Sequence, residues 1–238
     1  MIETIALQHS YDETTVIDGI SLTIDDGEWV VIIGANGSGK TTLVRHFNGL
    51  CTPDSGSVII NGTPVSTNLL AARTAVGMVF QTPRDQFVAA TVEADVAFGP
   101  ENLGLSHADI ETRVSDALAT VGLSECRHAR TSELSGGERA RVAIAGVLAM
   151  RPDHIVLDEP FAGLDLSARA SIQDRLRTLA ANGTGLITVT HDLEAVINDV
   201  DRIIVIQEGQ IAYEGSPTSA CQWLSTHSVD IVSPSILS

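Results

Sequence analysis

The sequence predicts an α/β fold built around a phosphate-binding loop, and three observations predict it. The glycine-rich segment GANGSGKTT at residues 34–42 matches the pattern G-x-x-x-x-G-K-[ST]. It follows the apolar run 29–33, which is typical of a buried strand, and it leads into a predicted helix over 40–48. Short β-branched runs then alternate with helical patterns along the chain, as expected of an α/β fold.

The other predicted elements keep this alternation, with one interruption. The expected strands are residues 2–7, 21–24, 58–60, 75–80, 155–157 and 186–189, followed by a hairpin of 202–207 and 210–214. From about 91 to 150 the character changes, because residues 107–121 and 138–150 are alanine-rich with apolar residues at helical spacing. The simplest account is an α/β core that carries a helical insertion.

Length and composition suit one domain, which we place at residues 1–225, followed by a short serine-rich tail at 226–238. We find no apolar run of the roughly 20 residues that span a bilayer and no signal-peptide pattern. The three cysteines are far apart and odd in number, which argues against a disulfide framework or a zinc site and favours a reducing cytoplasm.

The charge balance is strongly acidic. The chain has 30 acidic and 14 basic residues and a formal net charge of −16, so its surface should repel nucleic-acid phosphates. The acids are dispersed and lysine is nearly absent, which favours a solvated surface suited to a halophile over attraction to a basic partner.

The phosphate loop predicts ATP binding. Gly34, Gly37 and Gly39 let successive backbone N–H groups turn toward a polyphosphate, which would lie at a helix N-terminus. Lys40, the only lysine of the chain, should reach the β- and γ-phosphates, and the Thr41 hydroxyl should ligate Mg²⁺. The predicted ATP-binding residues of the loop are Gly34, Ala35, Asn36, Gly37, Ser38, Gly39, Lys40, Thr41 and Thr42.

Two further motifs carry chemistry. In HIVLDEP, residues 154–160, adjacent strand residues point opposite ways, so Asp158 suits the Mg²⁺ shell and Glu159 suits polarising the attacking water. In LSGGE, residues 134–138, Ser135 and the glycine amides open a helix that could bind an anion. Taken alone, this second motif is better explained as a capping box of Ser135 and Glu138.

The chain resembles the ABC ATPase superfamily over nearly its whole length, with the motifs in the family's order: the loop at 34–42, Gln81, LSGGE, LDEP, Asp165 and His191. The resemblance implies a P-loop NTPase core with a β-rich N-terminal subdomain and a helical insertion. It also implies a head-to-tail dimer in which each ATP lies between one chain's loop and the other's LSGG segment. The residues contacting ATP across that dimer would be Ser135, Gly136, Gly137, Glu138 and Asp165.

The resemblance also implies roles for single residues. Gln81 matches the glutamine that touches magnesium and the attacking water, which makes Thr41, Gln81 and Asp158 the implied Mg²⁺ set. His191 matches the switch histidine at the γ-phosphate, so the implied catalytic residues are Glu159, His191 and Gln81. Tyr11 lies where the family often places an adenine-stacking aromatic, although a tyrosine there is as often a packing or turn residue.

Residues 76–105 and 138–152 are similar to the energy-coupling-factor group, whose members drive uptake of cobalt, nickel, biotin or other vitamins. This implies a peripheral location at the cytoplasmic membrane face, with transmembrane and substrate-binding subunits and a second ATPase subunit as partners. Phe87, Val92 and Phe98 are possible contacts to a membrane subunit or core residues of the insertion. Leu166 and Phe161 depart from the family's usual residues, and the C-terminal domain of many members is expected to be shortened or missing.

The sequence thus predicts an ATP-hydrolysing importer subunit. A soluble ABC ATPase of DNA repair or translation is disfavoured by the single nucleotide-binding domain and the acidic charge. A sensor that binds ATP without turnover is disfavoured by Glu159 and His191.

Overall fold

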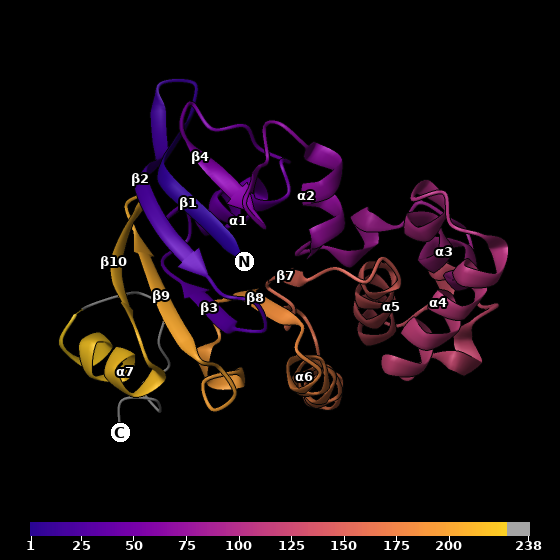
Figure 1. The fold of residues 1–238 in the computed structure, drawn as a ribbon. Helices are drawn as coiled ribbons and strands as arrows, with labels where there is room; N and C mark the ends of the chain where they lie inside the picture. The colour runs from indigo at the N-terminus through magenta and orange to yellow at the C-terminus, as the bar shows by residue number, and fades with distance from the viewer. Residues whose placement is uncertain (228–238) are drawn as a thin grey trace.

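A computed structural model describes residues 1–227 and contains two β-sheets and a separate group of helices (Figure 1). The strands are β1 (Ile2–Tyr11), β2 (Thr14–Ile24), β3 (Trp29–Ile33), β4 (Ser55–Ile60), β5 (Thr63–Pro64), β6 (Val76–Val79), β7 (His154–Asp158), β8 (Gly185–Val189), β9 (Arg202–Gln207) and β10 (Gln210–Gly215). The helices are α1 (Lys40–Phe47), α2 (Leu69–Ala75), α3 (Val92–Asn102), α4 (His107–Thr120), α5 (Gly136–Ala149), α6 (Leu166–Ala181) and α7 (Pro217–Thr226). The α/β fold predicted from the sequence is confirmed.

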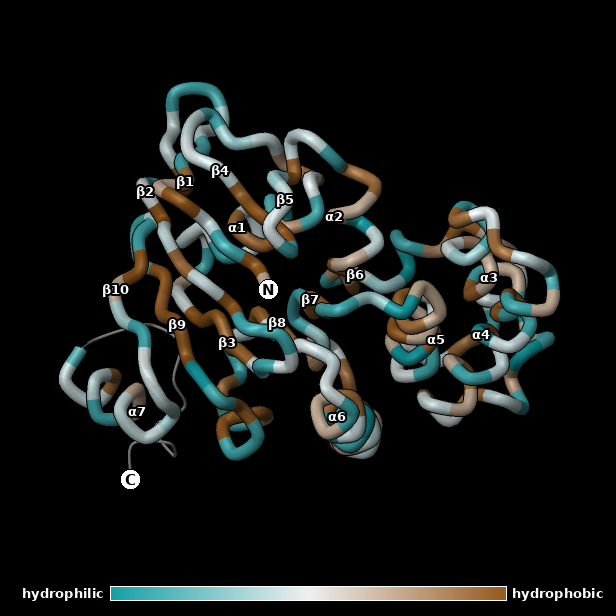
Figure 2. The backbone as a smooth tube through the Cα atoms, viewed as in Figure 1, coloured by the Kyte–Doolittle hydropathy of each residue, from teal (hydrophilic) through white to brown (hydrophobic). Residues whose placement is uncertain are grey.

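The larger sheet has six strands in the order β10-β9-β3-β8-β7-β6. Strands β9, β3, β8, β7 and β6 run parallel, and only the β9–β10 hairpin is antiparallel. Strands β3, β7 and β8 are buried along their whole length, which is why they read as continuous apolar runs without alternation (Figure 2). Because parallel strands end at the same edge, the segments that follow β3, β6, β7 and β8 meet there.

The two faces of this sheet contact different cores. Trp29, Val31 and Ile33 of β3 pack with the helical part of the chain. Val30 and Ile32 pack with α1 and the smaller sheet. This alternation follows from the period of two along a strand.

The smaller sheet has four strands in the antiparallel order β2-β1-β4-β5. Strands β1 and β2 are longer than the predicted 2–7 and 21–24. Their pairing contains register shifts, one of them between Thr4 and Leu7, where Ala6 has a φ of 44°. Two further shifts, between Leu7 and Gln8 and between His9 and Ser10, interrupt the alternation of polar and apolar residues beyond the predicted end of β1.

Helices α3, α4 and α5 pack together and occupy the predicted helical insertion, and α5 also contacts β6 of the larger sheet (Figure 1). Val92, considered above as a contact to a membrane subunit, is fully buried in this helical core, so the core interpretation is the correct one for that residue. Phe98 remains 47% exposed, and Phe87 is partly buried against the same core.

Helices α2, α6 and α7 go beyond the elements predicted from the sequence. Helix α6 is the longest of them and buries Ile172, Leu176 and Leu179. This stripe has helical spacing, but it is diluted by polar residues on the other faces. Helix α7 runs to Thr226, so the predicted boundary at 225 falls inside a helix, and most of the predicted tail lies outside the described residues.

A buried hydrogen bond links two central strands: Trp29 Nε1 of β3 donates to Thr188 Oγ1 of β8 at 3.1 Å. The exposed fraction is 1% for Trp29 and 0% for Thr188. No water reaches the indole N–H, so its hydrogen bond depends on this hydroxyl.

We expect Thr188→Val to lower the free energy of unfolding by about 1–3 kcal/mol, because it keeps the side-chain shape but leaves the indole donor buried and unpaired. Urea denaturation followed by tryptophan fluorescence measures this. Thr188→Ser is the control, since it keeps the acceptor. A Thr188→Val chain more stable than Thr188→Ser would contradict the assignment.

Candidate functional site

The glycine-rich loop runs from the end of β3 to the start of α1, and the backbones of two other strands approach it closely. A Cβ on Gly34 would lie 2.2 Å from the carbonyl oxygen of Ile206 in β9. A Cβ on Gly39, which has a φ of 104°, would lie 2.6 Å from the carbonyl oxygen of Val16 in β2. Both positions therefore require glycine for space as well as for conformation.

Lys40 lies inside this loop rather than in solvent. Its Nζ donates to the carbonyl oxygens of Gly34 at 2.7 Å and Ala35 at 2.9 Å. Burial lowers the pKa of Lys40, and the carboxylates of Glu159 and Asp158 oppose that shift. The ammonium is thus held at the helix N-terminus where the sequence placed it.

Ser38 has an unpartnered hydroxyl in the same loop. The residue is 6% exposed, and its Oγ has no hydrogen-bond partner. A buried hydroxyl without a partner is rare, and it suits a loop that binds an oxygen-rich group.

Asp158 lies at the end of β7 and faces α1. Thr41 Oγ1 donates to both carboxylate oxygens of Asp158, at 3.0 and 3.2 Å. Burial raises the pKa of Asp158, and the hydrogen bond from Thr41 opposes that rise. Two of the predicted magnesium ligands are therefore in direct contact.

Glu159 leaves the strand in a different direction. Its φ is 50°, a left-handed conformation rare for a residue with a side chain, and its backbone N–H donates to the carbonyl oxygen of Val189 at 2.8 Å. Its Oε1 lies 2.9 Å from Nδ1 of His191, and its Oε2 accepts from Thr190 Oγ1 at 3.2 Å. The two adjacent carboxylates have separate partners, in line with their separate predicted roles.

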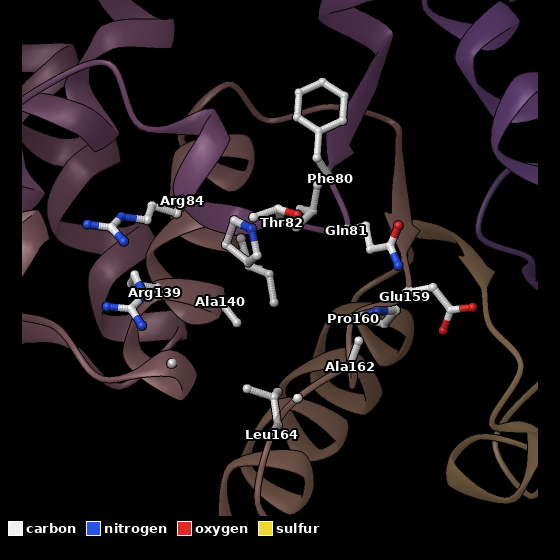
Figure 3. Close-up of a pocket in the computed structure, with 15 residues that line it drawn as sticks. Phe80, Gln81, Thr82, Arg84, Arg139, Ala140, Glu159, Pro160, Ala162 and Leu164 are labelled. Atoms are coloured by element: carbon white, nitrogen blue, oxygen red, sulfur yellow. The ribbon is translucent and has the colours of Figure 1, made fainter.

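Lys40, Thr41, Asp158 and Glu159 line one cavity of about 170 Å³, whereas Ser38, Thr190 and His191 are not part of its wall. Gln81, which follows β6, is part of its wall and also of a neighbouring cleft of about 290 Å³ (Figure 3). In that cleft Gln81 lies beside Glu159, while Arg84 and Arg139 lie on the opposite side. The residues around the smaller cavity are Val16, Asn36, Gly37, Gly39, Lys40, Thr41, Thr42, Gln81, Asp158, Glu159 and Val189.

The LSGGE segment forms a separate site. Ser135 is the N-cap of α5 and makes a complete capping box with Glu138, so the capping interpretation of the sequence is confirmed. Hydrogen bonds from Ser135 lower the pKa of Glu138. Asp165 caps α6 in the same way, accepting from the Ala168 N–H at 2.8 Å.

A cavity of about 360 Å³ brings Ser135, Gly136, Gly137, Glu138 and Asp165 together. None of these residues is part of the wall of the cavity at Lys40. The phosphate loop and the LSGGE segment of one chain thus form two distinct surfaces.

Tyr11 does not reach the cavity at Lys40. It is 46% exposed, its hydroxyl lies 3.6 Å from Sγ of Cys51, and its ring packs edge-on against His9 at 4.7 Å. Stacking on adenine stays a prediction for this residue.

Thr190 is a functional candidate that the sequence analysis missed. It is fully buried at the end of β8 and donates to the Glu159 carboxylate. Its neighbour Asp192 donates its backbone N–H to the Thr190 hydroxyl at 2.9 Å. The only signal in the sequence was their position on either side of His191.

Within residues 1–227, no helix combines the length and the hydropathy needed to cross a membrane.

Comparison with known proteins agrees with this geometry. Residues 17–162 match the family model described as ABC transporter, which is more than half of the chain. A Halobacterium salinarum protein, named provisionally as an ABC transporter ATP-binding protein, is 60% identical over 217 residues, covering 91% of this chain and 94% of that protein.

Two further relatives have more specific names. The cobalt import ATP-binding protein CbiO of Syntrophus aciditrophicus is 46% identical over 221 residues. The energy-coupling factor transporter ATP-binding protein EcfA of Methanocaldococcus jannaschii is 45% identical over 221 residues. Both alignments cover 91% of this chain and 79% of the relative.

Solved structures share the fold. The cbiO1 protein of Clostridium perfringens, described as part of the ABC transporter complex cbiONQ, superposes with a TM-score of 0.84 and 34% identity, covering 95% of this chain and 94% of that chain. The dimeric bacterial ABC transporter cassette MJ0796 gives a TM-score of 0.81 and 28% identity, covering 91% and 99%. The chain therefore belongs to the ATP-hydrolysing, ATP-binding subunits of ABC transporters, close to the CbiO and EcfA energy-coupling factor ATPases.

Proposed function

We propose that this chain couples ATP hydrolysis to the uptake of cobalt or nickel ions, or of a vitamin such as biotin, through membrane subunits. The observation that carries the proposal is the 45–46% identity, over 91% of the chain, to proteins named for cobalt import and energy coupling. We place it at the cytoplasmic face of the membrane, where the exposed ring of Phe98 is available for a membrane subunit.

ATP would bind at the loop of residues 34–42. The Lys40 ammonium now donates to two neutral backbone carbonyls, and phosphate oxygens are stronger acceptors because they are charged. We propose that Lys40 exchanges these carbonyls for the β- and γ-phosphates, while the unpartnered Ser38 hydroxyl and the N-terminal amides of α1 donate to the same anion.

Thr41, Asp158 and Gln81 fit a magnesium ion. All three offer oxygen donors on one cavity, and Mg²⁺ prefers hydroxyl and carboxylate oxygens together with phosphate and water. When bound, the ion would neutralise charge on the phosphates. The Thr41–Asp158 hydrogen bond holds both protein donors at one place.

Glu159 would act as the general base that polarises the attacking water, because it is the second carboxylate on this cavity and is not bonded to Thr41. His191 contacts one of its carboxylate oxygens and Thr190 contacts the other, so both oxygens are oriented. The His191 side chain is 64% exposed, so its other ring nitrogen is available to a γ-phosphate.

A second ATPase subunit would complete each site. Ser135, Gly137 and Asp165 lie on a separate cavity, so they would reach an ATP bound by a partner chain rather than their own. The dimeric cassette among the similar structures supports this arrangement.

We expect Glu159→Gln to reduce kcat for ATP hydrolysis by about 100-fold or more, because the amide cannot accept a proton. ATP binding should persist, since Lys40 and the loop are unchanged. Steady-state ATPase assays and nucleotide binding measure the two effects. Glu194→Gln, an exposed carboxylate near His191, is the matched control. Unchanged hydrolysis in Glu159→Gln would instead favour a non-hydrolysing ATP sensor.

We expect Asp158→Asn to stabilise the nucleotide-free chain at neutral pH, by about 2–4 °C in Tm. The pKa of Asp158 is raised in the folded state, so its stabilising contribution is present at acidic pH and is lost as the pH rises through the folded pKa. The asparagine amide has no charged form, so the variant does not lose this stability at neutral pH. The same variant should lose the magnesium-dependent stabilisation by ATP.

Thermal melts with and without Mg·ATP, at several pH values, measure both effects. Asp153→Asn, at the exposed opposite end of β7, should do neither. A lower Tm in Asp158→Asn, or retained magnesium dependence, would contradict this role.

The transport function is tested by purifying the native complex from membranes in high salt and identifying its subunits by mass spectrometry. Recovery with small membrane subunits supports the proposal, and the substrate-binding subunit among them would identify the cargo. Recovery from the soluble fraction with ribosomes or DNA-repair factors would overturn it in favour of a soluble ABC ATPase.

A further inference from the structure

Arg169 occupies an unusual place between the two surfaces of the site. It lies in the first turns of α6, and its Nε donates to the carbonyl oxygen of Leu164 at 3.2 Å. Its Nη1 lies 2.5 Å from Oδ2 of Asp192. One guanidinium thus joins the residue before Asp165 to the residue after His191.

The contacts of Arg169 continue to the catalytic pair. Asp192 donates its N–H to the Thr190 hydroxyl, which donates to Glu159. Glu159 in turn begins the short segment that runs through Pro160 and Ala162 to Leu164 (Figure 3). The chain of contacts closes on itself, with Arg169 as the member that joins its two ends.

The segment held by Arg169 separates two cavities. Gly163 and Leu164 belong to the walls of both the cleft at Glu159 and the cavity at Ser135. A shift of this segment would therefore alter both surfaces together. Glu159 has the left-handed φ of 50°, a conformation that persists only where its surroundings hold it.

We propose that Arg169 is a positioning residue that fixes the Glu159–His191 pair relative to the partner-facing Asp165 segment. The proposal rests on the catalytic roles proposed above for Glu159 and His191. A planar guanidinium suits this place because it donates in two directions at fixed geometry, which a lysine ammonium on a flexible stem does not reproduce.

An ordinary ion pair would explain the same contact without a role in catalysis. The Arg169 and Asp192 side chains are 34% and 25% exposed, and pairs this accessible add little to folding stability. Arg177 provides the comparison within the same helix. It pairs with Asp199 at 2.9 Å and with Asp174 at 3.0 Å, but none of these residues contacts Glu159, His191 or the segment before Asp165.

The test compares Arg169→Lys with Arg177→Lys in the full chain. We expect Arg169→Lys to lower kcat about tenfold or more, because small displacements of reacting groups are costly to rate, while its ATP affinity stays within about twofold. Arg177→Lys should leave kcat within about twofold. Both variants should melt within about 2 °C of the native chain.

A second comparison separates positioning from packing. If Arg169 acts through Asp192, then Asp192→Asn should show the same loss of kcat, and the double variant should lose no more than either single one. Additive losses, a kcat of Arg169→Lys near the native value, or an equal loss in Arg177→Lys would overturn the proposal. Glu159→Gln distinguishes failure of the proposed catalytic roles from failure of this inference. If Glu159→Gln does not lower kcat, the catalytic roles of Glu159 and His191 are wrong. If Glu159→Gln is inactive but Arg169→Lys has a native kcat, only the positioning role of Arg169 is wrong.

Discussion

The parallel pairing of β6, β7, β8 and β3 is the constraint on which the rest of the site depends. Each strand delivers one functional group at the same edge of the sheet: Gln81 after β6, Asp158 at the end of β7, Thr190 after β8 and the glycine-rich loop after β3. A slip of one residue would exchange the faces of a whole strand. The two faces pack into two different cores, so a slip would force both cores to repack; close packing therefore holds the register of the strands.

The smaller sheet and the hairpin of β9 and β10 limit the space around the glycine-rich loop. The backbones of Val16 and Ile206 approach Gly39 and Gly34 so closely that no side chain fits. The loop conformation therefore depends on segments far apart in the sequence. This is a physical reason for an extra β-rich sheet beside the nucleotide-binding core.

Burying the charged groups of the site lowers the folding stability of the nucleotide-free chain. Burial lowers the pKa of Lys40 and raises that of Asp158, which shows that both charged forms are held away from water. Their mutual attraction offsets part of this effect. The site thus keeps charged groups in place for a charged ligand, at some expense in stability, as is common where binding and catalysis require preorganised groups.

The sequence by itself determined the fold class and the loop of residues 34–42, and it predicted different roles for Asp158 and Glu159. These follow from short-range physics: glycine freedom, strand periodicity and the apolar runs of a buried sheet. The family resemblance added Gln81, Asp165 and His191 to the predicted sites and favoured anion binding over simple capping at the LSGGE segment.

Only the tertiary structure decided which groups touch. The bonds of Thr190 and His191 to Glu159, the burial of Val92 and the position of Tyr11 at Cys51 all join segments that are far apart in sequence or depend on the packing around them. Arg169 is the clearest example, because nothing local distinguishes it from Arg177 on the same helix. Its contact with Asp192 exists because the segment after β8 and the start of α6 lie side by side, and no pattern of neighbouring residues encodes that packing.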